Sequence, residues 1–218
     1  MSQTMQQMLA CAGGVLAGLA VAAPVLLGQQ RALIKARWAA NHDDITGLPN
    51  RRLFHTRLRA ALADNTPVGV VLLDLNNFKA VNDTLGHEVG NDLLHQVGRR
   101  LNSLPGNVGI AARLSGDEFA LLVRGTREDT AAAAHAAWQA IAAGTILVVN
   151  GDLPVTASVG YTHTHHPNVS PRHPNVSPRQ LLTQADSAMY EAKTADGRVR
   201  EYLPHRTVTV RSRDRQRH

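Results

Sequence analysis

One short run of residues limits the possible folds more than any other feature of this sequence. Residues 68–75 read VGVVLLDL and are apolar except for the small Gly69 and for Asp74. A short, β-branched, nearly continuous apolar run of this kind is typical of a central strand buried on both faces of a sheet. The sequence therefore predicts a layered domain with this strand near its centre.

The segments around this run alternate between helical and strand patterns. Residues 109–123, GIAARLSGDEFALLV, place two apolar stretches around a Ser-Gly-Asp-Glu centre, which predicts a β-hairpin with the acidic pair at or beside its tip. A second hairpin is expected around residues 150–152, joining strands at 145–149 and 155–162. Apolar periodicity predicts helices at 51–63, 88–104, 131–143 and 180–193. Together these elements predict an α/β domain whose sheet is mixed.

The first thirty residues contain no Lys, Arg, Asp or Glu. Within them, residues 8–28 form an apolar run of 21 residues, which as a helix spans about 30 Å, the thickness of a bilayer core. A cleaved signal peptide usually has a basic start, whereas MSQTMQQ is neutral. Arg31, Lys35 and Arg37 follow the run and favour a cytoplasmic C-terminal side. We expect one transmembrane anchor; a cleaved signal and a buried helix of a soluble protein are the alternatives.

The net charge of +6 is not evidence for nucleic-acid binding. Five arginines and one aspartate lie in residues 205–218, so this tail holds four of the six net positive charges and the rest forms no basic patch. The single cysteine, Cys11, excludes an internal disulfide framework and any multi-cysteine zinc site. We expect no nucleic-acid partner.

A tandem copy of HPNVSPR occupies residues 166–179. Two proline-rich copies of seven residues are too few and too short for a solenoid, and proline disfavours helix and central strand. We expect a surface loop over 163–179, in which His163, His165, His166 and His173 are solvated rather than metal ligands.

Two acidic sites end or interrupt predicted strands. Asp74 closes the buried run, and Asp117 and Glu118 lie in the hairpin. A carboxylate at the end of a buried strand carries a desolvation cost that a bound cation can offset. If the two strands are neighbours, Asp74 and Asp117 converge, and oxygen ligands of this kind select Mg²⁺ or Mn²⁺, often together with substrate phosphates. The alternative is that Asp74 caps a turn and Asp117 is an ordinary hairpin-tip residue.

Five motifs occur in a fixed order: HDDITGLPNRRLF, LLDLNNFKAVNDTLGHEVGNDLL, ARLSGDEFALLV, ASVGYT and ADSAMYEAK. In this order they resemble the GGDEF family of diguanylate cyclases over roughly residues 40–203. The resemblance implies a fold like that of nucleotidyl cyclases and the polymerase palm, here preceded by the membrane anchor. It also implies condensation of two GTP molecules into cyclic di-GMP with release of pyrophosphate, by a homodimer with two Mg²⁺ or Mn²⁺ ions per active site.

The resemblance further implies a role for individual residues. Asp74, Asp117, Glu118 and the carbonyl of Leu75 would form the metal site, with Asp117 accepting the proton of the ribose 3′-hydroxyl and Glu118 supporting the site. The residues expected to contact the nucleotide are Asn82 and Asn91 at the guanine base, His87 elsewhere on the nucleotide, and Lys79, Lys193 and Arg198 near the phosphates.

The sequence departs from the family pattern at four places. Ser115 replaces the first glycine of the signature, and Asn91 replaces the aspartate that accepts the guanine N1–H and 2-amino protons. Arg198 follows Lys193 one residue later than expected. Gly106 and Gly109 stand where the family's inhibitory RxxD motif has its arginine and aspartate, so feedback by product through that site is not expected.

The sequence thus predicts an anchor at 1–28, a helical stalk at 29–42, a GGDEF domain at 43–203 and a basic tail at 204–218. The protein would cross the bacterial inner membrane once, with the domain in the cytoplasm. The alternative to a cyclase is a weak or inactive domain that acts as a nucleotide receptor or dimerisation module, and the intact set of acidic residues favours the enzyme.

Overall fold

The structure is a computed structural model of the chain and describes residues 3, 25–64, 66–143, 146–148, 151–164, 176–195 and 198–204. The chain divides into two units, Met1–Asn41 and His42–His218. In the first unit, residues 25–39 form a helix on which Leu33, Ile34 and Trp38 are exposed. Most of the expected anchor, residues 8–24, lies outside the described residues. Among the helices that are described, none is both long and apolar enough to cross a membrane.

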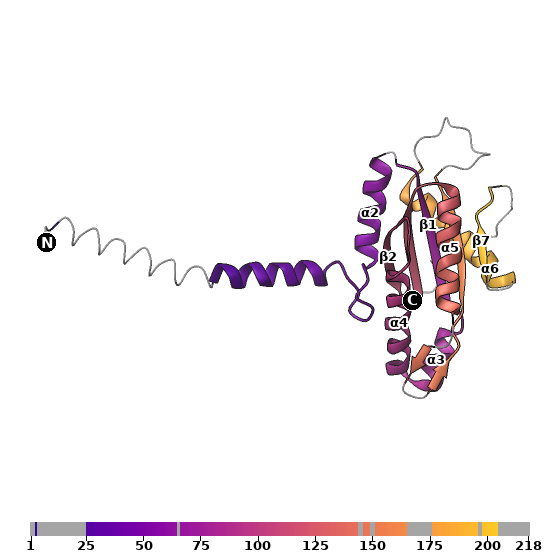
Figure 1. Cartoon of the computed structure of the whole chain (residues 1–218), viewed down its shortest axis with the longest axis horizontal. Coiled ribbons are helices and arrows are strands. Elements are labelled where there is room, and N and C mark those ends of the chain that lie inside the picture. Colours follow the sequence, from indigo (N-terminus) through magenta and orange to yellow (C-terminus); the bar gives the residue numbers. More distant parts are fainter. Residues whose placement is uncertain are drawn as a thin grey trace, which may run out of the picture. The chain divides into compact units, whose positions relative to one another are not determined.

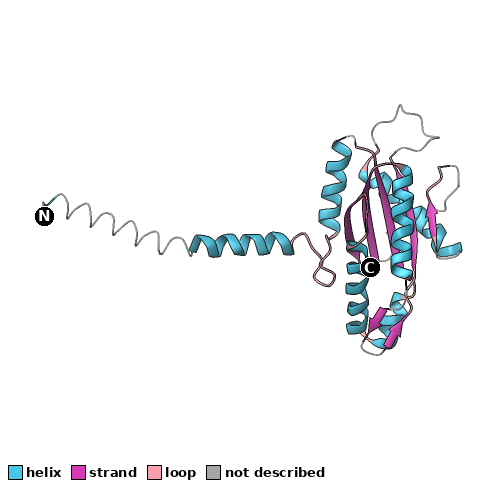
Figure 2. Cartoon of the chain, in the orientation of Figure 1, coloured by secondary structure: helices cyan, strands magenta, loops and turns pink. Residues whose placement is uncertain are grey.

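The second unit is built of alternating helices and strands (Figure 2). In chain order these are α2 (Arg51–Ala63), β1 (Val68–Leu75), α3 (Phe78–Leu85), α4 (His87–Asn102), β2 (Val108–Ser115), β3 (Glu118–Arg124), α5 (Arg127–Ala142), β4 (Ile146–Val148), β5 (Gly151–Leu153), β6 (Ala157–His163), α6 (Pro178–Ala195) and β7 (Val199–Glu201). The predicted helices at 51–63, 88–104, 131–143 and 180–193 correspond to α2, α4, α5 and α6, so the expected alternation is confirmed.

Strand β1 lies at the centre of a sheet of five described strands in the order β2-β3-β1-β6-β7. It pairs antiparallel with β3 on one side and with β6 on the other, and all eight of its residues are buried. The β6–β7 pair is parallel, which makes the sheet mixed as predicted. The buried apolar run at 68–75 is therefore the central strand.

Helices cover both faces of this sheet (Figure 1). Successive side chains of a strand point to opposite faces, so β1 contributes to two apolar clusters. Val70 and Leu72 pack with buried residues of α2 and α6, whereas Val71 and Leu73 pack with those of α4 and α5. The side chain of Asp74 follows Val70 and Leu72 and therefore belongs to the face of α2 and α6.

Two helices begin earlier than the apolar pattern predicted, because polar side chains cap them. Thr126 and Asp129 form a capping box that starts α5 four residues before the Ala-rich stretch. Helix α6 begins at Pro178, inside the second HPNVSPR copy, where Ser177 Oγ accepts a hydrogen bond from the backbone N–H of Gln180 at 3.2 Å. Proline suits the first helical position because its missing N–H would have no helical partner there. The prediction that this copy is loop throughout is wrong for its last two residues.

The second predicted hairpin is only partly correct. Strand β4 pairs with β5 in a separate two-stranded sheet, while the strand predicted at 155–162 is β6 and pairs with β1 and β7. Gly151 and Asp152 of the predicted turn belong to the three-residue strand β5, which pairs with β4, so the predicted partner β6 is not the one that pairs with β4. Residues 154–156 separate β5 from the longer strand β6, which pairs with β1 from Gly69 to Leu75.

His163 does not belong to a solvated loop. It is the last residue of β6, is 2% exposed, and its Nε2 lies 2.9 Å from the carbonyl oxygen of Gly125. The expectation of a solvent-facing histidine is therefore wrong at this position. The other three histidines of the expected loop lie outside the described residues.

Candidate active site

Asp74 and Asp117 meet at one end of the β1–β3 pair. Asp74 stands directly opposite Glu118 in the antiparallel register, and the backbone N–H of Leu75 donates to the carbonyl oxygen of Asp117 at 3.2 Å. Asp117 occupies the turn between β2 and β3, next to Gly116, whose φ of +49° lies in the left-handed region that glycine adopts most easily. The expectation that the two strands are neighbours is confirmed.

The electrostatics of this corner favour a cation. Burial raises the pKa of Asp117 above its ordinary value, and the neighbouring charge of Asp74 raises it further. Asp74 is itself only 5% exposed. Two carboxylates that crowd each other in a partly desolvated place are stabilised by positive charge brought between them.

Lys193 supplies part of that charge. It lies near the end of α6, and its Nζ donates to Asp74 Oδ1 at 2.6 Å, across 119 residues of sequence. The ammonium is half-exposed, whereas the carboxylate is almost fully buried. The sequence placed Lys193 near the phosphates of a nucleotide, and the structure brings it to the acidic corner itself.

The carboxylate of Glu118 has a different set of partners. Ser115 Oγ donates to Glu118 Oε2 at 3.0 Å, and Arg51 Nη2 lies 3.8 Å from the same oxygen. Glu118 and Arg51 also line a pocket of about 210 Å³ between α2 and α6. Glu118 thus lies at the acidic corner but is held by a hydroxyl and a guanidinium.

Asn82, Gly90 and Asn91 come together where α3 and α4 meet. A Cβ atom on Gly90 would stand 2.0 Å from Asn82 Oδ1 and 3.3 Å from Cζ of Phe78, so the absence of a side chain at Gly90 makes room for the Asn82 amide. Asn91 is the next residue of α4 and is exposed, as is His87 at the first position of that helix. Lys79 is exposed on α3.

Arg198 takes a less central position. It precedes β7, its side chain is exposed, and its carbonyl oxygen accepts a hydrogen bond from the N–H of Val159 at 2.9 Å. Residues 196–197, which connect it to α6, lie outside the described residues. The structure thus groups Asp74, Leu75, Asp117, Glu118 and Lys193 at one corner and Asn82, His87 and Asn91 at the α3–α4 junction, with Arg198 in neither group.

The acidic corner can hold a hard divalent cation through oxygen atoms. Asp74 and Asp117 supply two carboxylates and Leu75 a backbone carbonyl, which suits Mg²⁺ or Mn²⁺ if phosphate and water oxygens complete the shell. Within the described part of the chain, no three or more His, Cys, Asp and Glu side chains form a metal-binding group.

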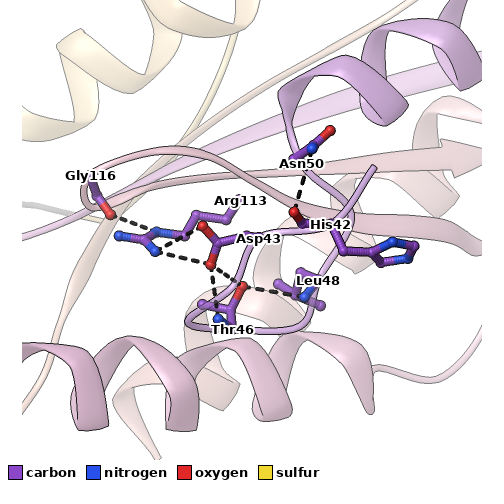
Figure 3. A network of polar contacts seen from close by, with 7 residues as sticks. All are labelled: His42, Asp43, Thr46, Leu48, Asn50, Arg113 and Gly116. Carbon is purple, nitrogen blue, oxygen red and sulfur yellow. Dashed lines mark hydrogen bonds and ion pairs between the residues drawn. The ribbon is translucent and has the colours of Figure 1, made fainter. Parts of the chain in front are cut away.

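A partly buried ion pair between Arg113 and Asp43 supports the signature turn (Figure 3). Arg113 Nη1 contacts both carboxylate oxygens of Asp43 at 3.0 Å, and Arg113 Nε donates to the carbonyl of Gly116 at 2.9 Å. Thr46 donates to Asp43 Oδ1 from both its N–H and its hydroxyl, at 2.8 Å each. Burial raises the pKa of Asp43, but the hydrogen bonds from Thr46 and Arg113 outweigh burial and hold it below its usual value.

Sequence reasoning missed the roles of Asp43, Arg51 and Arg113. Arg113 could have been noticed, because a charged residue two positions before the signature interrupts an otherwise apolar strand. Asp43 and Arg51 belong to the motif HDDITGLPNRRLF, from which only the family resemblance and a helix at 51–63 were inferred. Their partners lie at least 67 residues further along the chain, and no local pattern indicates such a pairing.

Comparison with known proteins gives one consistent result. An uncharacterized protein encoded in the hutH 5′ region of Streptomyces griseus is 39% identical over 176 residues, which cover 78% of this chain and 68% of the relative. The cyclic di-GMP phosphodiesterase PdeR of Escherichia coli is 36% identical over 167 residues, covering 76% of this chain but only 24% of the relative. This chain thus corresponds to one part of that longer protein.

Solved structures agree with the sequence matches. The GGDEF domain of PA1120 (TpbB or YfiN) from Pseudomonas aeruginosa superposes with a TM-score of 0.65 at 31% identity, covering 74% of this chain and 94% of that one. The coiled coil and GGDEF domain of DgcB from Caulobacter crescentus, in complex with c-di-GMP, gives a TM-score of 0.75 at 23% identity, covering 86% and 98%, and shows the same fold. The family model described as diguanylate cyclase, GGDEF domain, matches residues 40–198, so the chain belongs to the GGDEF family.

Proposed function

We propose that this protein is a diguanylate cyclase that condenses two GTP molecules into cyclic di-GMP with Mg²⁺ or Mn²⁺, as a homodimer. The observation that carries the proposal is the convergence of Asp74 and Asp117, with Lys193, at the end of the β1–β3 pair. A domain that only bound nucleotide would have no need for two mutually repelling carboxylates in a desolvated place. Family membership makes nucleotidyl transfer the chemistry that best fits them.

In this reaction the 3′-oxygen of one GTP forms a bond to the α-phosphorus of the other, and the bond from that phosphorus to pyrophosphate breaks; the same step then closes the ring. The proton of the 3′-hydroxyl passes to Asp117, whose raised pKa makes it a better acceptor than an ordinary aspartate. The divalent ions, when bound, stabilise the attacking oxygen and the charge that develops on pyrophosphate. Lys193 leaves Asp74 to neutralise the phosphates, while Asn82 and Asn91 contact the base.

Dimerisation is part of the proposal because each domain would hold one GTP and the product contains two. Two copies must therefore bring their acidic corners face to face. Confinement to a membrane by residues 8–28 would raise the effective concentration of the copies.

The direct test is to incubate the full-length protein with GTP and Mn²⁺ and to identify the products by mass spectrometry. We expect cyclic di-GMP and two pyrophosphates per cycle. Nucleotide binding without any product would instead support a receptor, an alternative favoured by the Ser115 contact to Glu118 and by Asn91.

The anchor is tested by cell fractionation. Full-length protein should sediment with membranes, and a variant that lacks residues 1–30 should appear in the soluble fraction, because it has lost the apolar run at residues 8–28. Intact-mass measurement of the membrane form checks that residues 1–28 are not removed as a signal peptide. Full-length protein in the soluble fraction would contradict a spanning helix.

Gly90→Ala should weaken GTP binding without unfolding the domain. The added methyl group would stand 2.0 Å from Asn82 Oδ1 and must displace that amide, so we expect the KM for GTP to rise about tenfold, corresponding to one lost hydrogen bond to the base. Alanine is the better helix former, which offsets part of the strain. Gly98→Ala on the same helix is the control: it crowds Thr46 instead and should leave KM unchanged while lowering stability. Equal KM values for the two variants would contradict the role of Asn82.

Asn91→Asp should sharpen the preference for GTP over ATP. An aspartate accepts both the N1–H and 2-amino protons of guanine, whereas the asparagine amide turns a donor toward one of them or pairs with adenine. The ratio of kcat/KM for GTP to that for ATP should rise by about tenfold, the effect of correcting one mispaired polar group. Asn102→Asp at the other end of α4 adds the same charge and should leave the ratio unchanged. A wild type that already rejects ATP as strictly as the Asn91→Asp variant would show that Asn91 does not set selectivity.

A further inference from the structure

The residue that departs from the family signature, Ser115, contacts a carboxylate of that signature. Ser115 Oγ donates to Glu118 Oε2 at 3.0 Å. A glycine at this position has no side-chain donor, so the contact exists only because of the substitution. Arg51 Nη2, at 3.8 Å, approaches the same oxygen from the first turn of α2.

The local backbone sets up this contact. Ser115 is the last residue of β2 and Glu118 the first of β3, and the two stand opposite each other across the turn formed by Gly116 and Asp117. The register between the strands shifts between Arg113 and Ser115, and this irregularity brings Ser115 level with Glu118. Arg113 Nε holds the carbonyl of Gly116 at 2.9 Å and steadies the turn. The Ser115 hydroxyl and the Glu118 carboxylate therefore face each other at the end of a hairpin whose turn is held by Arg113.

We propose that Ser115, assisted by Arg51, is a positioning residue that holds the Glu118 carboxylate away from the carboxylate pair of Asp74 and Asp117, and that it thereby weakens binding of a divalent cation by the nucleotide-free protein. The proposal rests on the proposed function, because it assigns the acidic corner to a metal. With Glu118 held in this way, the metal site of the nucleotide-free protein has two carboxylate ligands, Asp74 and Asp117, and substrate phosphates must supply the remaining ligands.

Two observations support this assignment. Asp74 and Glu118 are paired directly across β1 and β3, yet among the described residues no three such side chains form a metal-binding group. In addition, the hydroxyl of Ser115 and the guanidinium of Arg51 both lie next to the same oxygen of Glu118, Oε2, and the Glu118 side chain is 18% exposed. For Glu118 to bring Oε2 to the metal, it must give up a hydrogen bond to a charged acceptor, which is stronger than one between neutral groups.

The test is a titration of the full-length protein with Mn²⁺ alone, with no nucleotide, in which the free ion is measured by electron paramagnetic resonance. Ser115→Ala removes the hydroxyl, and alanine can adopt the same strand conformation. We therefore expect the Kd for Mn²⁺ to fall about fivefold, which corresponds to the net free energy of one hydrogen bond. Ser115→Thr keeps the hydroxyl and should stay within about twofold of wild type. Arg51→Gln should shift the Kd in the same direction as Ser115→Ala but by less, because Arg51 is half-exposed and more distant.

Two controls define the site and the chemistry. Asp74→Asn in the Ser115→Ala background should abolish the tightened binding, which assigns it to the acidic corner. Ser103→Ala removes another exposed serine hydroxyl, bonded to the carbonyl of Arg100 at the end of α4, and should not change the Kd. An unchanged or raised Kd in Ser115→Ala, or no Mn²⁺ binding by it at millimolar concentration, would overturn the proposal. Because no nucleotide is present, this outcome is independent of whether the protein makes cyclic di-GMP.

Discussion

Replacing Asp117 with asparagine should abolish cyclic di-GMP formation while leaving the domain as stable as wild type or more stable. Asparagine has nearly the same shape but cannot accept the 3′-hydroxyl proton and is a poor ligand for Mg²⁺. Loss of a positioned general base alone lowers rates by about 10²–10⁴-fold. Product analysis by mass spectrometry after incubation with GTP and Mn²⁺ measures the loss.

The expected stability of the Asp117→Asn variant follows from the pKa of Asp117. Burial first, and then the charge of Asp74, raises that pKa, so ionised Asp117 destabilises the folded state at neutral pH. A raised carboxyl pKa means that the folded state binds more protons than the unfolded state, and stability falls as pH rises through the interval above the ordinary value of 3.8. The asparagine variant should unfold at an equal or higher temperature than wild type at pH 7, and the difference should vanish below about pH 4.

Asp64→Asn is the matched control for both measurements. Asp64 is exposed at the end of α2, and its substitution makes the same change of charge away from the acidic corner. It should retain activity and show no pH-dependent gain. Product formation by Asp117→Asn at the wild-type rate would remove the catalytic assignment, and a large loss of stability would show that Asp117 serves the fold.

Gly160→Ala should have the largest effect on stability. Gly160 lies in β6 where α6 crosses the sheet, and an added Cβ would stand 2.0 Å from the backbone nitrogen of Met189 and 2.3 Å from the carbonyl oxygen of Ala185. These are backbone atoms of a helix and cannot turn aside, so the whole of α6 must shift. We expect a loss of about 3 kcal/mol, the upper part of the usual range for overpacking.

The same shift should impair the site, because α6 carries Lys193 to Asp74. Urea unfolding followed by circular dichroism measures the stability, and Gly109→Ala is the control. Gly109 also lies in a strand, β2, but a Cβ there would meet only the carbonyl oxygen of Leu122 at 3.5 Å and the flexible side chain of Arg124, which are ordinary contacts. Equal midpoints for the two variants would show that α6 is not pressed against Gly160.

The sequence predicted the elements that carry strong periodic patterns. The buried run at 68–75 became the central strand β1, and Leu93, Leu94 and Val97 became the buried face of α4. The hairpin at 109–123 was predicted because two apolar stretches flank a turn of small and polar residues, and β2 and β3 form it. In each case the pattern depends on residues close together in the chain.

Short elements were missed or misassigned. Helix α3 is eight residues long and β7 three, and neither was predicted, although Phe78 and Val81 of α3 pack partly buried against the core. The partner of β4 was misassigned because several apolar residues follow the turn on both sides of Pro154. His163 was assigned to a loop by its polar neighbours in sequence, although its ring is covered by the segment around Gly125.

By itself, the sequence determined the α/β architecture, the central buried strand, the family and the set of acidic and polar residues available for chemistry, because these depend on side-chain type and local spacing. Only the tertiary structure decided what those residues contact. Lys193 reaches Asp74 across 119 residues, and Arg51 reaches Glu118 only because α2 is packed beside the β2–β3 hairpin. Such contacts arise when helices settle on a sheet face to bury their apolar sides, and no spacing within the chain indicates where their polar residues will then meet.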